Sequence, residues 1–141
     1  MGLLPNSIAA QNLTILSSIL LLLSLCHVAK CKPNTTVKIA QCNIGTYTKG
    51  DPFTISLAYV LAELEDVTPA RQGYDFRNIS PYPNAFAYGH AACNQTLTTS
   101  DCAACLSAAR TAVLSSCDQR IGGRIVLYDC TIRYEQYPFD D

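Results

Sequence analysis

Cysteine is the residue type in this sequence whose spacing suggests chemistry most directly. The 141-residue chain contains eight of them: Cys26, Cys31, Cys42, Cys93, Cys102, Cys105, Cys117 and Cys130. Three follow the pattern Cys93-x8-Cys102-x2-Cys105 in the second half of the chain. Closely spaced thiols can form structural disulfides, act as a redox pair or bind zinc, so the protein class depends on which chemistry applies.

A structural role for the cysteines is favoured over the two alternatives. The pair Cys102 and Cys105 has the spacing of a redox motif, but a third cysteine lies close by and the surrounding pattern is not a βαβ unit. Zinc needs four ligands in recognisable pairs, and the mature part of the chain adds only His90 to its thiols. We therefore expect disulfides and neither a metal nor a cofactor, although the spacing does not decide which cysteines are joined.

The N-terminal region has the composition of a secretory signal peptide. Residues 13–25 are mostly apolar and carry no charge, a stretch shorter than the roughly 20 residues of a membrane-spanning helix. Cleavage after Cys31 would place small side chains, Ala29 and Cys31, at the two positions that matter for the protease. We expect residues 1–31 to be a cleaved signal peptide, with an uncleaved anchor as the alternative. Residues 32–141 then form a single domain with six cysteines, an even number suited to disulfides.

The charge of the mature chain excludes some partners. Only Lys30 of the ten Lys and Arg residues precedes the predicted cleavage site, so nine remain against eleven Asp and Glu residues, with no run of one sign. A nucleic-acid footprint is absent from this pattern, and no further apolar segment predicts a membrane span. Triplets at Asn34, Asn78 and Asn94 match the N-glycosylation signal, although Pro81 weakens the second.

The periodicity of the first half predicts a strand and a helix. Residues 36–42 alternate as a short strand would. Asp51 followed by Pro52 resembles a helix start, and apolar residues then recur at helical spacing until Pro69 ends the helix. Residues 70–84 contain glycine, prolines and polar side chains, and we expect a long surface loop there.

The second half predicts another helix between strands. Residues 85–93 are rich in aromatic side chains and suggest a strand. An alanine-rich helix follows over residues 101–115, capped by Thr99 or Ser100. Residues 124–137 are dense in β-formers and predict one bent strand or a strand pair. This order favours an α+β fold with helices on one face of an antiparallel sheet.

Seven motifs together resemble the ginkbilobin family of small antifungal plant proteins, whose domain recurs in cysteine-rich receptor-like kinases and secretory repeat proteins. These motifs are Gln41-Cys42-Asn43, Gly73-Tyr74-Asp75, Ala87-Tyr88-Gly89, Cys93-x8-Cys102-x2-Cys105-Leu106, Ile121-Gly122-Gly123-Arg124, Tyr128-Asp129-Cys130 and Tyr134-Glu135-Gln136. The resemblance implies two helices packed on one face of a five-stranded antiparallel sheet. It also implies three disulfides, Cys42–Cys117, Cys93–Cys102 and Cys105–Cys130.

The same resemblance implies a mannose site formed by Asn43, Arg124 and Glu135. These side chains suit vicinal hydroxyls, because the carboxylate accepts, the guanidinium donates and the amide does both. On one straight strand residues 124 and 135 would face opposite sides, so a turn or bulge near residues 129–131 is required. The alternative is structural: Arg124 and Glu135 form a surface ion pair and Asn43 is a turn residue.

The function implied is a secreted, extracellular (apoplastic) mannose-binding lectin with antifungal, defence-related activity on mannan-type glycans. The alternative is an apoplastic protein-interaction module of the cysteine-rich secretory repeat type, contacting other secreted proteins or receptor ectodomains without sugar. Catalysis has little support: His90 is expected to be packed or exposed, no serine follows a nucleophile pattern, and only Asp129 could partner Glu135. We therefore assign no catalytic residue and expect no enzyme.

Overall fold

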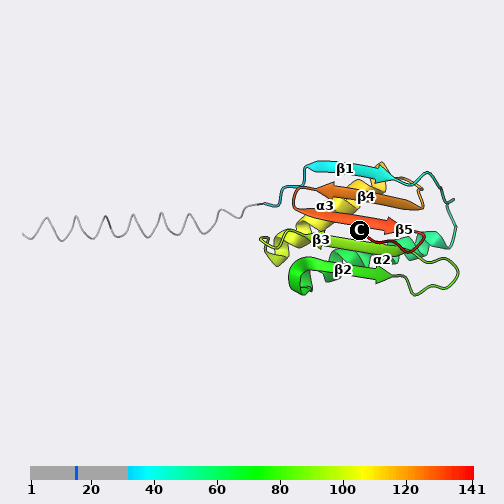
Figure 1. The fold of residues 1–141 in the computed structure, drawn as a ribbon, viewed down its shortest axis with the longest axis horizontal. Helices are drawn as coiled ribbons and strands as arrows, with labels where there is room; N and C mark the ends of the chain where they lie inside the picture. The colour runs from blue at the N-terminus through cyan, green and yellow to red at the C-terminus, as the bar shows by residue number, and fades with distance from the viewer. Residues whose placement is uncertain (1–14, 16–31) are drawn as a thin grey trace, which may run out of the picture. The chain divides into compact units, whose positions relative to one another are not determined.

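A five-stranded antiparallel sheet forms the framework of the domain, with the strands side by side in the order β1-β4-β5-β3-β2 (Figure 1). The strands are β1 (Val37–Cys42), β2 (Asp75–Ile79), β3 (Tyr88–Cys93), β4 (Gly122–Leu127) and β5 (Cys130–Glu135). Helices α2 (Phe53–Val67) and α3 (Thr99–Ser116) lie behind the sheet in Figure 1, and the 3₁₀ helices η1 (Thr68–Ala70) and η2 (Gln72–Tyr74) follow α2. The predicted α+β fold, with two helices on one face, is confirmed.

The computed structural model describes Ile15 and residues 32–141. The predicted signal peptide, residues 1–31, therefore lies outside the described residues except at Ile15. Within the described part, no helix is long and apolar enough to cross a membrane.

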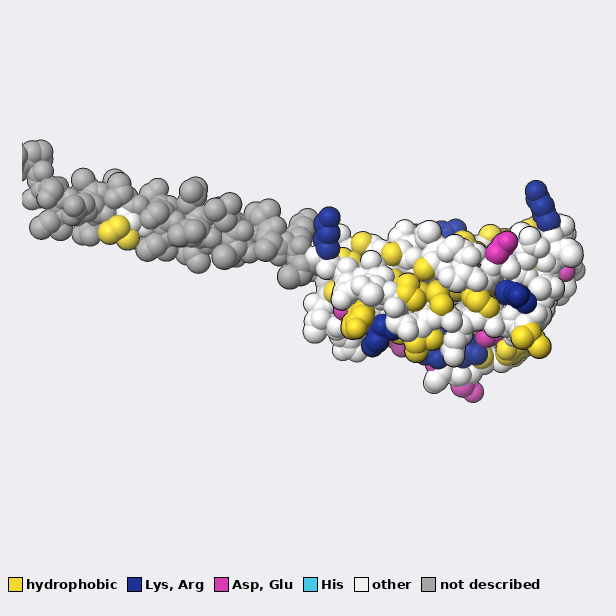
Figure 2. Space-filling view, turned by 90° about the horizontal axis from the view of Figure 1, so that it is seen from above, with side chains coloured by type: hydrophobic (Ala, Val, Ile, Leu, Met, Phe, Trp, Pro, Cys, Tyr) yellow, Lys and Arg dark blue, Asp and Glu magenta, His cyan; other side chains and the backbone are white. Residues whose placement is uncertain are grey.

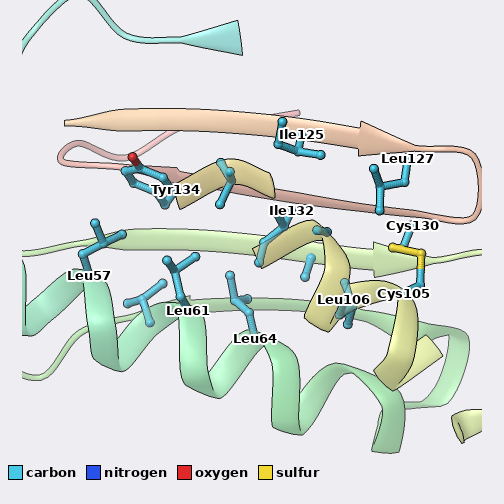
Figure 3. Close-up of a cluster of buried hydrophobic side chains, with 14 of the residues drawn as sticks. Leu57, Leu61, Leu64, Cys105, Leu106, Ile125, Leu127, Cys130, Ile132 and Tyr134 are labelled. Atoms are coloured by element: carbon cyan, nitrogen blue, oxygen red, sulfur yellow. A yellow bond between two sulfur atoms is a disulfide. The ribbon is translucent and has the colours of Figure 1, made fainter. Parts of the chain in front are cut away.

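The core lies between the two helices and the sheet. Figure 3 shows Leu57, Leu61 and Leu64 of α2 directed toward the strands, where each is at most 3% exposed. Burying one such side chain contributes roughly 1.5–3 kcal/mol, so this stripe is what holds the helix in place. Tyr134 of β5 is fully buried in the same layer, and its hydroxyl donates to the carbonyl oxygen of Arg120 at 3.0 Å.

Three disulfides connect α3 to the sheet. Cys42 of β1 is bonded to Cys117 at the end of α3, and Cys93 of β3 is bonded to Cys102 at its start. Figure 3 shows the third bridge, between Cys105 of α3 and Cys130 of β5. The implied pairing is confirmed. Cys102 and Cys105 have different partners, so the redox-pair and zinc alternatives do not apply to them.

The prediction of a loop over residues 70–84 is wrong, because it contains strand β2. Gly73 adopts a φ of +79°, which turns the chain after α2 and lets it return along β3. In β2 only alternate residues are partly buried, and the others are the polar Asp75 and Arg77 and the exposed Ile79. An edge strand with such a composition has little β signature in its sequence.

The predicted helix starts are displaced by one or more residues. Helix α3 is capped by Thr98 rather than by Thr99 or Ser100, and the Thr98 hydroxyl accepts from the backbone N–H of Asp101 at 3.1 Å. Helix α2 begins at Phe53, whose N–H donates to the side chain of Asp51 at 2.9 Å. Asp51 therefore accepts a hydrogen bond from the first turn, as a capping residue does. The assigned cap position is Pro52, so Asp51 lies one position further from the helix than predicted.

Candidate functional site

A polar cavity of about 220 Å³ opens where β1, β4 and β5 lie side by side. It is lined by Gln41, Cys42, Asn43, Arg124, Arg133, Glu135 and Tyr137. The three residues of the predicted site are thus brought together, although they are 81 and 11 positions apart along the chain. Their identities came from the resemblance, and their common location is a property of the fold.

The register of β4 and β5 explains why Arg124 and Glu135 share a face. The strands are joined by a turn at Tyr128 and Asp129, and the register pairs Arg124 with Arg133 and Gly122 with Glu135. Directly paired residues of antiparallel strands project to the same side of a sheet. All four positions therefore belong to the face opposite the helices, which we call the open face.

Glu135 is the anchor of the cavity. The residue is only 7% exposed, and its Oε1 accepts hydrogen bonds from Nε and Nη2 of Arg133 at 3.2 and 3.1 Å. Its Oε2 accepts from the amide of Asn43 at 3.4 Å. The ion pair of Glu135 is therefore with Arg133, which the sequence reasoning did not single out, and not with Arg124.

Gly122 makes room for the Glu135 carboxylate. A Cβ at position 122 would lie 1.7 Å from Oε2 and 2.5 Å from Cδ of Glu135. Real Cβ atoms do not approach so closely, so the carboxylate can occupy this position only over a glycine. The glycine pair in the motif thus has a direct role in shaping the cavity.

Asn43 is held from three sides. Its backbone N–H donates to Gly122, its Oδ1 accepts from Gly45 at 3.0 Å, and its Nδ2 donates to the Tyr137 hydroxyl at 3.1 Å. The preceding residue, Cys42, is fixed by its disulfide. Asn43 therefore stabilises a turn, as the structural alternative requires, and it also lines the cavity.

Arg124 differs from the other charged residues of the cavity. Its Nε is buried and has no hydrogen-bond partner, and among the described residues it forms no ion pair. An unpaired buried donor costs about 1–3 kcal/mol. The Arg124 guanidinium therefore has hydrogen-bond donors that no described residue of the protein uses.

Tyr137 adds an aromatic side chain beside these groups. It is 44% exposed and lines the cavity, and burial together with the charge of Glu135 raises the pKa of its phenol. It therefore stays protonated at neutral pH and can donate, or pack against the apolar face of a ring. Tyr134 is in the core, and Tyr128 is at the turn between β4 and β5, at the other end of these strands.

The remaining predicted positions lie elsewhere. Asn34 and Asn94 are exposed and both bond to Asp129, at the end of the strands away from Glu135. The Nδ2 of Asn78 is buried without a partner. Asp129 is consequently not placed as a carboxylate partner of Glu135.

His90 and metal ligands need separate mention. His90 is 8% exposed and bonds to Asp75 and Asp141, so it is packed, as expected, on the open face. Within residues that the structure describes, no group of three or more His, Cys, Asp or Glu side chains is placed to hold a metal ion.

Comparisons with known proteins agree with the resemblance. Residues 30–137 match the protein family described as salt stress response/antifungal. The chain is 39% identical over 108 residues to antifungal protein ginkbilobin-2 of Ginkgo biloba, covering 75% of this chain and 80% of the relative. It is 36% identical over 130 residues to antifungal protein ginkbilobin-like protein 1 of Picea glauca, covering 87% and 92%.

Two solved structures share the fold. They are the tandem DUF26 ectodomains of the Arabidopsis thaliana cysteine-rich receptor-like proteins PDLP5 and PDLP8, with TM-scores of 0.66 and 0.62 and identities of 21% and 25%. The matches cover 73% and 74% of this chain but only 51% and 46% of those chains. The chain therefore spans about half the length of each ectodomain.

Proposed function

The chain belongs to the salt stress response/antifungal family and has the DUF26 ectodomain fold, and from this premise we propose that it is a secreted plant defence protein that binds mannose-type glycans of fungal cell walls. The polar cavity is the binding site in this proposal, with Asn43, Arg124 and Glu135 as the residues that contact the sugar. The protein acts in the apoplast, where its disulfides persist.

The observation that carries the proposal is the convergence of complementary polar groups on one small cavity. Glu135 accepts, Arg124 has unused donors, and Asn43 does both, which matches the alternating donors and acceptors of vicinal hydroxyls. The cavity of about 220 Å³ is below the roughly 300–1,000 Å³ of pockets for drug-sized ligands, so it suits one monosaccharide. No metal is required by this donor set.

A shallow polar site of this kind binds a monosaccharide weakly. We expect a Kd near the millimolar range, about −4 kcal/mol. Polymeric mannan would compensate for this weak affinity. It offers many mannose units close together, which raises the avidity of several bound protein copies without any new contact.

Mannose titration followed by NMR, together with glycan-array binding in EDTA, tests the proposal. Arg124→Ala and Glu135→Gln should each weaken mannose binding at least about tenfold, which is the loss of one charge-assisted hydrogen bond. Matched controls are Arg71→Ala, whose guanidinium lies over Phe76, and Glu63→Gln on α2, and both should bind as the wild type does. Unchanged mannose binding in the two cavity variants would refute the assigned site.

A second candidate, the protein-interaction module, is favoured by the β1 edge of the sheet. All six residues of β1 are exposed, and Val37 and Ile39 keep 50% and 42% of their surface. Figure 2, seen from the β1 side of Figure 1, shows hydrophobic side chains gathered on this side of the domain. An exposed edge strand can pair with a strand of another protein.

Pull-down from cell-wall extract separates the two candidates. Partners bound through the cavity should be released by excess mannose, whereas partners paired with β1 should remain. Ile39→Lys should remove only the second group, since Ile39 does not line the cavity.

A further inference from the structure

The segment that follows β5 folds back over the open face. In Figure 1 the C-terminal end lies in front of the sheet, over β5 and β3, on the side away from the helices. The Asp141 carboxylate bonds to Nδ1 of His90, accepts from Nη1 of Arg133 at 2.8 Å and lies 4.0 Å from Nη2 of Arg77. Its side chain is only 17% exposed.

The groups that hold this carboxylate are placed by the sheet and not by the segment. Arg77, His90 and Arg133 come from β2, β3 and β5, and the register pairs Arg77 with His90 and His90 with Arg133. They form one cross-strand row on the open face, and Arg124 of β4 continues it. The backbone register therefore places these side chains next to one another on the open face.

The environment of Asp141 favours an ionised carboxylate. Burial would raise the pKa of Asp141, but hydrogen bonds from Arg133 and His90 outweigh it and hold the pKa below its ordinary value. Asp75, whose side chain is 63% exposed, faces His90 from the other side. Phe139 covers the same row, with its ring 4.2 Å from the guanidinium carbon of Arg133.

This carboxylate site adjoins the polar cavity. Arg133 belongs to both, because Nη1 binds Asp141 while Nε and Nη2 bind Glu135. A ligand with its ring in the cavity could therefore place a carboxylate on the other side of the Arg133 guanidinium, at the position where Asp141 binds. Hydroxyls next to a carboxylate are the chemistry of a hexuronate.

We propose that the row of Arg77, His90 and Arg133 is a binding site for the carboxylate of a hexuronate in an acidic polysaccharide, and that Asp141 occupies it as an intramolecular ligand until such a sugar displaces it. The part of this inference that places the neighbouring ring in the polar cavity rests on the proposed function. The carboxylate site itself depends only on the row and on Asp141.

Asp141, as the intramolecular ligand, lowers the apparent affinity of the site for a hexuronate. A site that is free only part of the time binds more weakly in proportion to the free fraction. Asp141→Asn removes the competing charge and keeps the shape of the side chain. It should strengthen binding of D-galacturonate by about three- to tenfold if Asp141 occupies the site some 70–90% of the time.

The test is a titration of the full mature chain with three probes, D-galacturonate, its methyl ester and mannose, at constant ionic strength, followed by NMR shifts of the His90 ring. Asp140→Asn is the matched control, because Asp140 is exposed and makes no interaction with the row. Tighter galacturonate binding in Asp141→Asn alone, with the methyl ester unaffected, supports the proposal. Arg77→Met in the Asp141→Asn background should then weaken it again.

Three results would overturn the carboxylate site: no galacturonate binding to Asp141→Asn, an equal gain in Asp140→Asn, or equal affinity for the methyl ester. Mannose reports on the proposed function separately. Galacturonate binding that shifts His90, together with no shift of Asn43, Arg124 or Glu135 by mannose, would remove the mannose site and leave the carboxylate site standing.

Discussion

At the scale of single residues, Glu135 and Gly122 depend on each other. Glu135 supplies the negative charge of the cavity, and Gly122 leaves the space that its carboxylate occupies. Gly122→Ala should displace the carboxylate and break its bonds to Arg133 and Asn43, since the new Cβ would lie 1.7 Å from Oε2. We expect a loss of about 1–3 kcal/mol in the free energy of unfolding, measured by urea denaturation.

A double-mutant cycle isolates this contact. In the Glu135→Ala background the colliding atoms are absent, so adding Gly122→Ala should cost much less than it does in the wild type. Equal costs in both backgrounds would mean that the glycine serves the strand backbone and not the carboxylate.

The sequence predicted part of the cavity at this scale. Asn43, Arg124 and Glu135, which the resemblance assigns to one site, all line the cavity, and the turn at Tyr128 and Asp129 removes the conflict of parity. Arg133 was missed, although it lies two positions before Glu135 and so had to share its face. The partner that the strand pattern could not reveal is Asp141, which becomes a neighbour of Arg133 only through the return of the chain over the sheet.

Elements are positioned by local signals, of which the cap of α3 is the clearest. Thr98→Ala should destabilise the domain by about 1 kcal/mol, because the hydroxyl that accepts from Asp101 is lost. Ser100→Ala, at a position that the sequence offered as a cap, should change the unfolding free energy by much less. Chemical denaturation of the two variants side by side distinguishes them, and the reverse order would contradict the observed cap.

Strand β2 marks the limit of what local patterns could predict at this scale. Phe76 is its only large apolar side chain that is partly buried, and Asp75, Arg77 and Asn78 are typical of loops. The strand exists because its backbone pairs with β3 over five positions. Such pairing depends on residues outside the segment, so the periodicity of residues 75–79 does not predict it.

The C-terminal segment is an element held by charge, and its docking should depend on pH. The pKa of Asp141 is lowered in the folded state, so docking is stabilised above the ordinary carboxyl value of 3.8 and lost as pH falls through the lowered pKa. The titratable or permanently charged groups that face it or its partners in the described part of the chain are Arg77, His90, Arg133, Asp75 and Glu135.

Backbone relaxation of residues 139–141 measures this release. The segment should be ordered at pH 6 and become mobile at a pH below 3.8, while the core remains folded. In Asp141→Asn the same residues should be mobile already at pH 6, because the charge that docks them is gone. A segment equally ordered at both pH values in the wild type would contradict the role of Asp141.

At the scale of the whole domain, residues 33–141, helix α3 is the central connection, because the three disulfides join it to strands from both halves of the domain. Cys42–Cys117 spans 75 positions, Cys105–Cys130 spans 25 and Cys93–Cys102 spans 9. In the chain-entropy model these closures stabilise by about 4.5, 3.5 and 2.5 kcal/mol. The longest one fastens β1, an edge strand that otherwise pairs only with β4.

That longest bridge should also be reduced first. Cys42 is exposed, whereas both half-cystines of each of the other two bridges are buried, so a thiolate in solvent can attack only Cys42 readily. Limited reduction followed by alkylation and mass spectrometry should label Cys42 and Cys117 before the others. Mannose binding should fall with the same time course, because Asn43 directly follows Cys42, while circular dichroism from the helices persists. Earlier labelling of Cys93–Cys102 or Cys105–Cys130 would show that the core opens before the edge, and that β1 is not the least protected part of the sheet.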